Sequence, residues 1–212
     1  MGELIVQKLL FADPKLFVPQ GAIAGGCATH AAAAALTVLG LISDPGRIMA
    51  KRAEPNSRRL WIALRDTYAQ GISFVELLRR MEELQFPVGI ERTEGKHHDV
   101  LRFAIDALRR QRPVILSFAP VNGPRSLHAV LAVGLSGRME SRRFEPSSLL
   151  VTDSCEQHPG LGPINARIEF SPAAKRETDG TYVTAWDRYR VSLDAAISLR
   201  RTARAQKTRK PL

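Results

Sequence analysis

The chain has 212 residues, of which 44% are hydrophobic and 25% are charged, and this composition favours one α/β domain with a sizeable core over two small domains. The formal net charge is +10, but no basic stretch interleaved with aromatic residues accompanies it, so we predict no specific nucleic-acid binding. The two cysteines, Cys27 and Cys155, are too few to suggest a disulfide framework, which indicates a reducing compartment.

The sequence predicts neither a signal peptide nor a membrane-spanning segment. The first residues lack the basic, apolar and small-residue regions of a signal peptide, and the longest apolar stretch, residues 31–42, is too short and too rich in alanine to span a bilayer. We therefore predict a cytoplasmic protein without a membrane span. Residues 1–198 form the predicted domain, and residues 199–212 form a basic, disordered tail that an acidic partner could bind.

The first half of the chain reads mainly as helices. A short strand is expected within residues 3–11 and a glycine-containing loop at 18–26. Ser73 and Glu76 have the spacing of a capping box at the start of a helix. Apolar periodicity and breaker residues predict helices at 27–39, 58–70, 74–85 and 98–112, with an exposed strand at 87–94.

The second half reads as strands. Apolar or alternating runs predict strands at 113–121, 127–137 and 148–154, with further strands or a closing hairpin at 166–172 and 181–193. Because the helices come first and the strands last, the order predicts an α+β fold: an N-terminal helical half whose Cys27 helix packs on a C-terminal, largely antiparallel sheet.

Cys27 is the first candidate for chemistry, because it occupies the first turn of a predicted helix. Unpaired backbone N–H groups and the positive end of the helix dipole favour a thiolate there, and a thiolate is the nucleophilic form of cysteine. We expect the glycines before it, Gly25 and Gly26, to let a substrate carbonyl approach closely. The alternative is a small buried hydrophobic residue, and this motif alone leaves both readings open.

Three further residues complete a catalytic pattern. His128 begins an apolar strand and could serve as base, Asp153 follows the next strand and could orient the imidazole, and the Gln20 amide could help bind an oxyanion. Each also has a structural alternative: a core histidine, a turn-capping aspartate and a solvent-exposed loop glutamine. Their order along the chain favours the catalytic reading.

These residues lie in a pattern that resembles papain-like cysteine peptidases, in particular the bacterial branch that processes double-glycine leader peptides. The resemblance covers residues 18–155 and is carried by the stretches PQGAIAGGCATHAAAAAL, GISFVELLRRMEELQFPV, LRFAIDALRRQRPVIL, SLHAVLAVGL and LLVTDS. It implies a papain-like fold in which Cys27 is the nucleophile, His128 the base, Asp153 the orienting acid and Gln20 the oxyanion-hole side chain.

The sequence departs from that branch at three positions. Gly26 and Ala28 flank the cysteine where the branch often has aspartate and glycine, and Ser154 follows the acid where proline is common. The leader-peptide substrate is therefore not carried over to this chain.

The two cysteines could also bind a metal or form a disulfide. Cys155, with Cys27, His128 and Asp153, could supply zinc ligands, but the short paired spacings typical of zinc sites are missing, so we predict no metal and no cofactor. A disulfide between Cys27 and Cys155 would block the nucleophile, and this question is left open. His30, three residues after Cys27, is expected to be a packed or partly exposed residue.

The sequence thus predicts a cysteine hydrolase that cleaves a peptide or amide bond through a thioester. An acyltransferase of the transglutaminase type would use the same thioester, and a non-catalytic binding module could keep the same cleft without reacting. Both alternatives stay open at this point.

Overall fold

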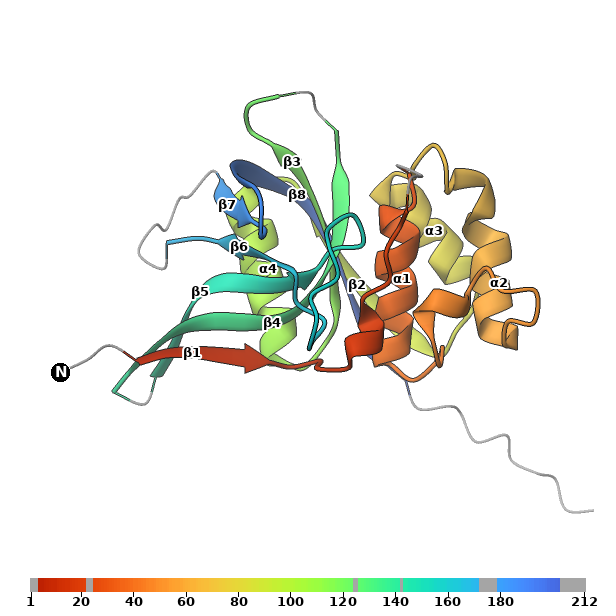
Figure 1. The fold of residues 1–212 in the computed structure, drawn as a ribbon, viewed down its shortest axis with the longest axis horizontal. Coiled ribbons are helices and arrows are strands. Elements are labelled where there is room, and N and C mark those ends of the chain that lie inside the picture. The colour runs from red at the N-terminus through yellow and green to blue at the C-terminus, as the bar shows by residue number, and fades with distance from the viewer. Residues whose placement is uncertain (1–3, 22–24, 124–125, 142, 172–178, 203–212) are drawn as a thin grey trace, which may run out of the picture.

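The computed structural model of the chain describes residues 4–21, 25–123, 126–141, 143–171 and 179–202 (Figure 1). The helices are α1 (Cys27–Val38), α2 (Pro55–Leu64), α3 (Phe74–Glu83) and α4 (His97–Arg109). The strands are β1 (Leu4–Leu9), β2 (Val88–Glu94), β3 (Val114–Pro120), β4 (His128–Glu140), β5 (Arg143–Thr152), β6 (Ala166–Glu169), β7 (Gly180–Val183) and β8 (Arg188–Arg201).

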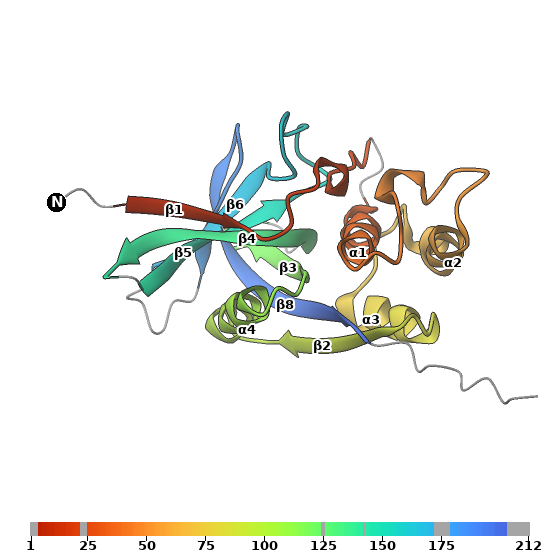
Figure 2. The same cartoon turned by 90° about the horizontal axis from the view of Figure 1, so that it is seen from below.

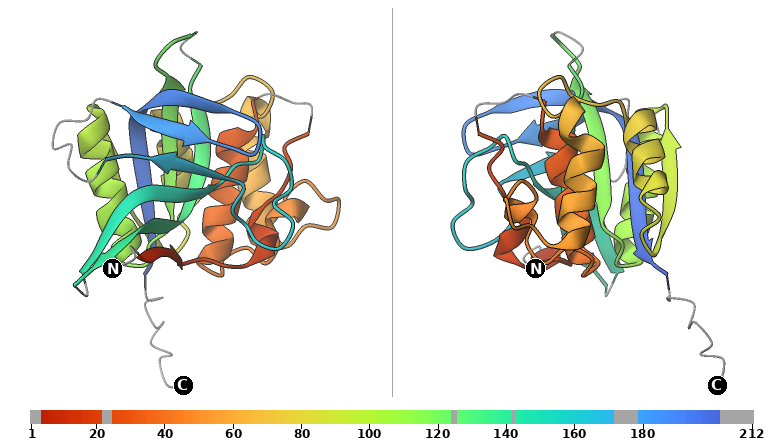
Figure 3. Two further views of the ribbon diagram at one scale, coloured as in Figure 1. Left: turned by 60° about the vertical axis from the view of Figure 1, so that its left-hand side comes forward. Right: turned by 90° about the vertical axis from the view of Figure 1, so that its right-hand side faces the viewer.

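Six of these strands close into an antiparallel barrel. Each strand pairs with the next in the order β4, β3, β8, β7, β6, β5, and β5 pairs again with β4 to complete the ring. The other two strands lie outside the ring, where β1 pairs with β4 and β2 pairs with β8. The two views of Figure 3 show the ring of strands from the side of the sheet and from the side of the helices.

The predicted papain-like α+β fold, with an N-terminal helical half packed on a C-terminal sheet, is wrong. The sheet curls and closes on itself, and the first half of the chain contributes β1 and β2 to the same strand network. Helix α4 also comes from the first half, yet it packs against β8 and β2 rather than with α1 and α2 (Figure 2). The molecule is therefore mostly a β-barrel with two extra strands and four short helices.

A glycine on β4 allows the barrel to close. The pairing between β4 and β5 shifts register twice, the second time between Ser136 and Gly137. A Cβ atom at Gly137 would come within 2.0 Å of the backbone oxygen of Glu145, so no other residue fits this approach. Such irregularities increase the local twist and bend a strand, as the closure of a small barrel requires.

Both faces of the strands are covered by apolar side chains. Along β3, Leu116 and Phe118 belong to a core that includes α4, whereas Ile115 belongs to a second core that includes α1, α2 and α3. This alternation follows from the period of two in a β-strand. The nearly continuous hydrophobic run of β3, which predicted a buried strand, is explained by burial on both sides.

Helix α1 carries Cys27 to the barrel wall. It packs mainly against β4 and β3, and every residue from 28 to 36 is buried. Because most of these residues are alanines, the helix can lie close to the strands. Among the helices of the described residues, none has both the length and the apolar character of a membrane span.

Residue 202 is the last residue that the structure describes. Residues 199–201 continue β8 and pair with β2, so this part of the predicted tail is strand. Residues 203–212, which make up most of the predicted disordered tail, lie outside the described residues.

Candidate active site

The start of α1 exposes backbone donors to the Cys27 thiol. Gly26 is the N-cap and offers no side-chain hydrogen bond, and the first turn of the helix contains no acidic residue. The early N–H groups of the helix are therefore not satisfied by a capping side chain. One of them, from Ala28, hydrogen bonds to the Cys27 sulfur, and the backbone of Ala129 on β4 does the same from the other side.

His128 and Asp153 meet because their strands pair directly. β4 begins at His128 and β5 ends at Thr152, and in the antiparallel register Leu131 lies opposite Thr152. The start of one strand and the end of the other therefore reach the same rim of the barrel. There, His128 Nε2 lies 2.6 Å from Asp153 Oδ2.

The Cys27 thiol hydrogen bonds to the same imidazole. Burial alone would raise the Cys27 pKa, but the hydrogen bond and charge of His128, with the two backbone donors, outweigh burial and lower the pKa below 9.0. Burial would likewise lower the pKa of His128, yet its hydrogen bonds and charge interactions with Asp153 and Cys27 raise that pKa to about 10. Both shifts favour a thiolate–imidazolium pair over a neutral thiol and imidazole.

Asp153 is held as a carboxylate by further donors. Although burial raises its pKa, hydrogen bonds to His128, Tyr182 and the Cys155 N–H lower the pKa overall. The Tyr182 hydroxyl donates to Oδ2, the oxygen that also faces His128, and the Cys155 N–H donates to Oδ1 at 2.8 Å. Asn165 fixes the backbone of Asp153 from both sides, accepting from its N–H and donating to its carbonyl, each at 2.8 Å.

Tyr182 and Asn165 were not among the residues singled out in the sequence. Tyr182 lies in β7 and is 1% exposed, and its ring stacks against Phe118, which in turn contacts the His128 ring edge-on. Neither residue is marked by a motif: Tyr182 reaches Asp153 from a strand 29 residues further along the chain, and Asn165 reaches it from just before β6, which pairs with β5. Tyr182 falls within the strand predicted over residues 181–193, but nothing in that stretch marks it as a partner of Asp153.

Gln20 lies beside the turn that follows Asp153. Its backbone N–H donates to the Ser154 carbonyl at 2.8 Å, and its side-chain oxygen accepts from Ser154 Oγ at 3.2 Å and from Cys155 Sγ at 3.3 Å. Gln20 is 6% exposed, so the alternative of a glutamine in solvent is wrong. Residues 22–24, between Gln20 and the nucleophile helix, lie outside the described residues.

The glycine before Cys27 has a packing role. A Cβ atom at Gly26 would lie 2.7 Å from Cε2 of Tyr68, so this ring explains why the position before Cys27 is a glycine. The Tyr68 hydroxyl lies 2.7 Å from His30 Nε2, and burial lowers the pKa of His30 to about 4. His30 is thus a packed, neutral histidine that supports the start of α1.

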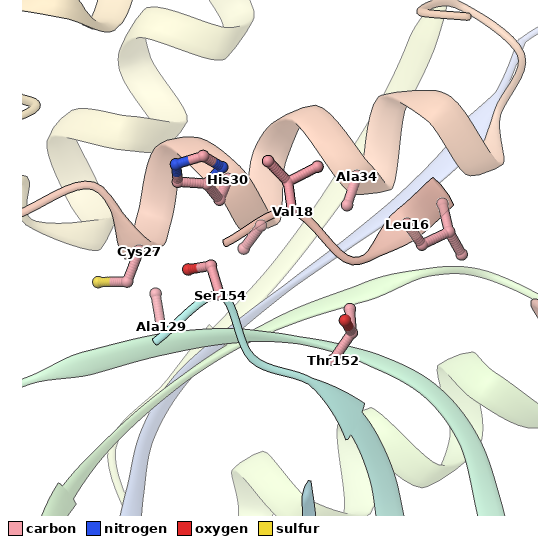
Figure 4. A pocket seen from close by; sticks show the side chains of 9 residues that line it. Leu16, Val18, Cys27, His30, Ala34, Ala129, Thr152 and Ser154 are labelled. Carbon is pink, nitrogen blue, oxygen red and sulfur yellow. The ribbon is translucent and has the colours of Figure 1, made fainter. Parts of the chain in front are cut away.

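A cleft and a smaller cavity border Cys27. A cleft of about 260 Å³ contains both Cys27 and His128 in its wall, together with Ile72, Phe74 and Leu127. Among the described residues that line it, no Asp, Glu, Lys or Arg occurs. Behind Cys27 is a cavity of about 10 Å³ between α1 and the strands, where His30 and Ser154 face each other (Figure 4); it has room for about one water molecule.

The site also contains a set of candidate metal ligands. One donor atom each from His128, Asp153 and Cys155 lie within 4.8 Å of one another, and imidazole, carboxylate and thiolate are all zinc ligands. However, the 2.6 Å hydrogen bond already joins His128 to Asp153, and a metal between them would have to replace it. The arrangement therefore fits proton transfer between side chains better than metal binding.

Comparison with known proteins adds no relative. No protein-family model matches this chain, and no curated protein matches it. The case for its function therefore rests on the geometry around Cys27.

Proposed function

We propose that this protein is a cysteine hydrolase that cleaves a peptide or amide bond through a thioester intermediate. The observation that carries the proposal is the chain of contacts from the Cys27 thiol to the His128 imidazole and on to the Asp153 carboxylate. A nucleophile, a base and an orienting acid in this order are the minimum for acyl transfer from an amide.

In the proposed acylation step, the Cys27 thiolate attacks the substrate carbonyl carbon. The oxygen becomes an oxyanion, for which the Cys27 N–H and the Gln20 amide are the proposed donors. The imidazolium of His128 gives its proton to the leaving nitrogen, the C–N bond breaks, and a thioester on Cys27 remains.

The deacylation step uses the neutral imidazole that acylation leaves behind. His128 takes a proton from water, and the resulting hydroxide attacks the thioester carbonyl. The C–S bond breaks, the acid product leaves, and the thiolate–imidazolium pair is restored. Asp153 supports both steps because its charge stabilises the imidazolium and its position fixes the ring.

The proposed substrate is a peptide or protein segment. Among the described residues that line the cleft beside Cys27, all side chains other than Cys27 and His128 are uncharged, which favours an uncharged segment next to the bond that is cleaved. Since a thiolate nucleophile is readily oxidised, we propose that the enzyme works in a reducing compartment such as the cytoplasm. An acidic partner for the basic tail, residues 199–212, stays a proposal from sequence alone.

The test combines labelling with cleavage. The wild type, Cys27→Ala and Cys155→Ser are treated with an electrophilic peptide probe near neutral pH and with a peptide library read by mass spectrometry. We expect the wild type and Cys155→Ser to be labelled and to cleave peptides, and Cys27→Ala to do neither while remaining folded. Equal labelling of Cys27→Ala and the wild type, or no cleavage by a wild type whose Cys27 is fully labelled, would overturn the proposal.

The same experiment bears on the two alternatives, an acyltransferase and a non-catalytic binding module. An acyltransferase would give a product that carries an added amine, whereas a hydrolase gives the free acid even when an amine acceptor is present. A binding module without catalysis would have no reason to lower the Cys27 pKa, and the contact with His128 supports the catalytic reading.

A further inference from the structure

The second cysteine lies at the same imidazole as the nucleophile. The Cys155 sulfur is within 4.8 Å of the donor atoms of His128 and Asp153, and it donates a hydrogen bond to the Gln20 side chain at 3.3 Å. Cys27 hydrogen bonds to His128 itself. Both thiols of the chain are therefore gathered around one ring, although 127 residues separate them in the sequence.

We propose that Cys27 and Cys155 form an oxidative modification site, in which peroxide oxidises Cys27 and Cys155 then closes a reversible disulfide that switches the site off. The proposal rests on the proposed function because it uses the same thiolate, but it does not require that the thiolate hydrolyse anything. Neither cysteine is bonded in the structure, which describes the reduced, open form.

The two thiols differ in a way that decides which is oxidised first. His128 and backbone donors lower the pKa of Cys27 despite its burial. Cys155 is exposed as a residue, but desolvation of its sulfur, together with the negative charges of Asp153 and Cys27, raises its pKa to about 12. Because peroxide reacts with thiolates, Cys27 is the peroxide-sensitive residue and Cys155 is the resolving thiol.

The chemistry balances with hydrogen peroxide as the oxidant. The Cys27 thiolate attacks one peroxide oxygen, the O–O bond breaks, and the departing hydroxide takes the proton of the His128 imidazolium to become water, which leaves a sulfenic acid on Cys27. The Cys155 sulfur then attacks the Cys27 sulfur, the S–O bond breaks, and the hydroxide leaves as water with the proton of Cys155. Peroxide is reduced to two waters while two thiols become one disulfide.

The first oxidation prepares the second step. A sulfenic acid is neutral, so the negative charge of Cys27 that helps to raise the Cys155 pKa is gone. His128 has given its proton to the first hydroxide, so its neutral ring can accept the proton of Cys155 and pass it to the hydroxide that leaves Cys27. The resulting disulfide would occupy the nucleophile and remove Cys155 from Gln20, so acylation would stop until a thiol reduced the bond.

The experiment measures mass and thiol content rather than hydrolysis. The wild type, Cys155→Ser and a control at an exposed serine, Ser43→Ala, are treated with hydrogen peroxide, denatured in a thiol-blocking reagent and digested. The wild type and Ser43→Ala are expected to give a linked Cys27–Cys155 peptide, and dithiothreitol should restore labelling of Cys27. In Cys155→Ser, Cys27 should pass to sulfinic and sulfonic acid, and dithiothreitol should not restore labelling.

Two results would overturn the proposal. One is the absence of a linked peptide in oxidised wild type; the other is equal recovery of Cys27 labelling in the wild type and Cys155→Ser. A linked peptide in a protein that cleaves no substrate would instead reject the hydrolase and keep the redox site, so the two proposals fail separately.

Discussion

The His128 imidazole and the Asp153 carboxylate approach each other to 2.6 Å between Nε2 and Oδ2, and they do so from the facing ends of two directly paired strands. The Asp153 side chain is 2% exposed, whereas that of His128 is 22% exposed. The acid is thus buried behind the ring, and the ring alone reaches the cleft. This order leaves Cys27, which lines the same cleft, on the open side of His128.

Replacing the acid is predicted to disable the base without removing the nucleophile. Asp153→Asn keeps the shape of the side chain but removes the charge that stabilises the imidazolium, so kcat for peptide cleavage should fall roughly 10²- to 10⁴-fold. Asp106→Asn, which changes an exposed carboxylate on α4, should leave kcat unchanged. Steady-state kinetics of both variants check this, and a fully active Asp153→Asn would remove Asp153 from the mechanism.

The rate of Cys27 alkylation and the rate of cleavage should depend on pH through the ionisation of Cys27 and His128. Below the lowered pKa of Cys27 the sulfur is a neutral thiol, so the rate should rise with pH in a range below 9.0. As the pH passes through about 10, His128 loses its proton, so cleavage, which needs the imidazolium as acid, should fall while alkylation persists. Iodoacetamide rates and kcat/KM measured across pH test both limbs. An alkylation rate that begins to rise only near pH 9 would show an ordinary thiol.

The local elements of this fold could be predicted from sequence, but its closure could not. The helix at Cys27, the Ser73 cap, whose Oγ accepts from the Glu76 N–H at 3.2 Å, and the buried strand of β3 all follow from patterns within a few residues. The barrel depends on β4 pairing with both β3 and β5, and no short-range pattern specifies which strand edges meet. Strands with an apolar face fit an open sheet and a barrel equally well.

The same distinction applies to the site. His128 and Asp153 could be expected to lie together, because His128 begins one strand and Asp153 follows the end of the next, and strands that are consecutive in sequence usually lie side by side. Tyr182 reaches Asp153 from β7, 29 residues further along the chain, and only the closed ring brings it there. The packing role of Gly26 could not be predicted for a similar reason, since Tyr68 lies 42 residues away and nothing near Gly26 shows that a ring will pack on it.

Tyr182 should contribute to stability through its buried hydroxyl. Tyr182→Phe removes a hydrogen bond to the Asp153 carboxylate, and a bond to a charged group is worth about 1.5–3 kcal/mol of unfolding free energy. Tyr189→Phe, on the adjacent and partly exposed ring, should change stability by less than about 0.5 kcal/mol. Urea denaturation of the reduced proteins compares them, and equal stabilities would mean that the Tyr182 hydroxyl has little energetic role.

A methyl group at the N-cap of α1 should disturb the nucleophile helix. Gly26→Ala places a carbon 2.7 Å from the Tyr68 ring, and overpacking of this kind costs about 1–3 kcal/mol. Gly162→Ala is the matched control, since nothing lies within 4 Å of its Cβ position. Thermal denaturation should separate the two variants. Should Gly26→Ala unfold at the same temperature as Gly162→Ala, the contact with Tyr68 would not be needed to seat α1.

Gln20 should affect turnover more than nucleophile reactivity. If its amide binds the oxyanion, Gln20→Ala should lower kcat roughly 10²- to 10³-fold, because the donor acts on charge that develops only in the transition state. Alkylation of Cys27 by iodoacetamide forms no oxyanion, so its rate should change far less.

Ser154→Ala provides the control for this prediction. It removes the hydroxyl that donates to the Gln20 side-chain oxygen at 3.2 Å and leaves the Cys155 contact in place, so kcat should fall less than in Gln20→Ala. A Gln20→Ala variant in which alkylation and turnover fall by the same factor would contradict an oxyanion role. Because the Gln20 backbone N–H is bonded to the Ser154 carbonyl, Gln20 would then act by holding the loop against the Asp153 turn.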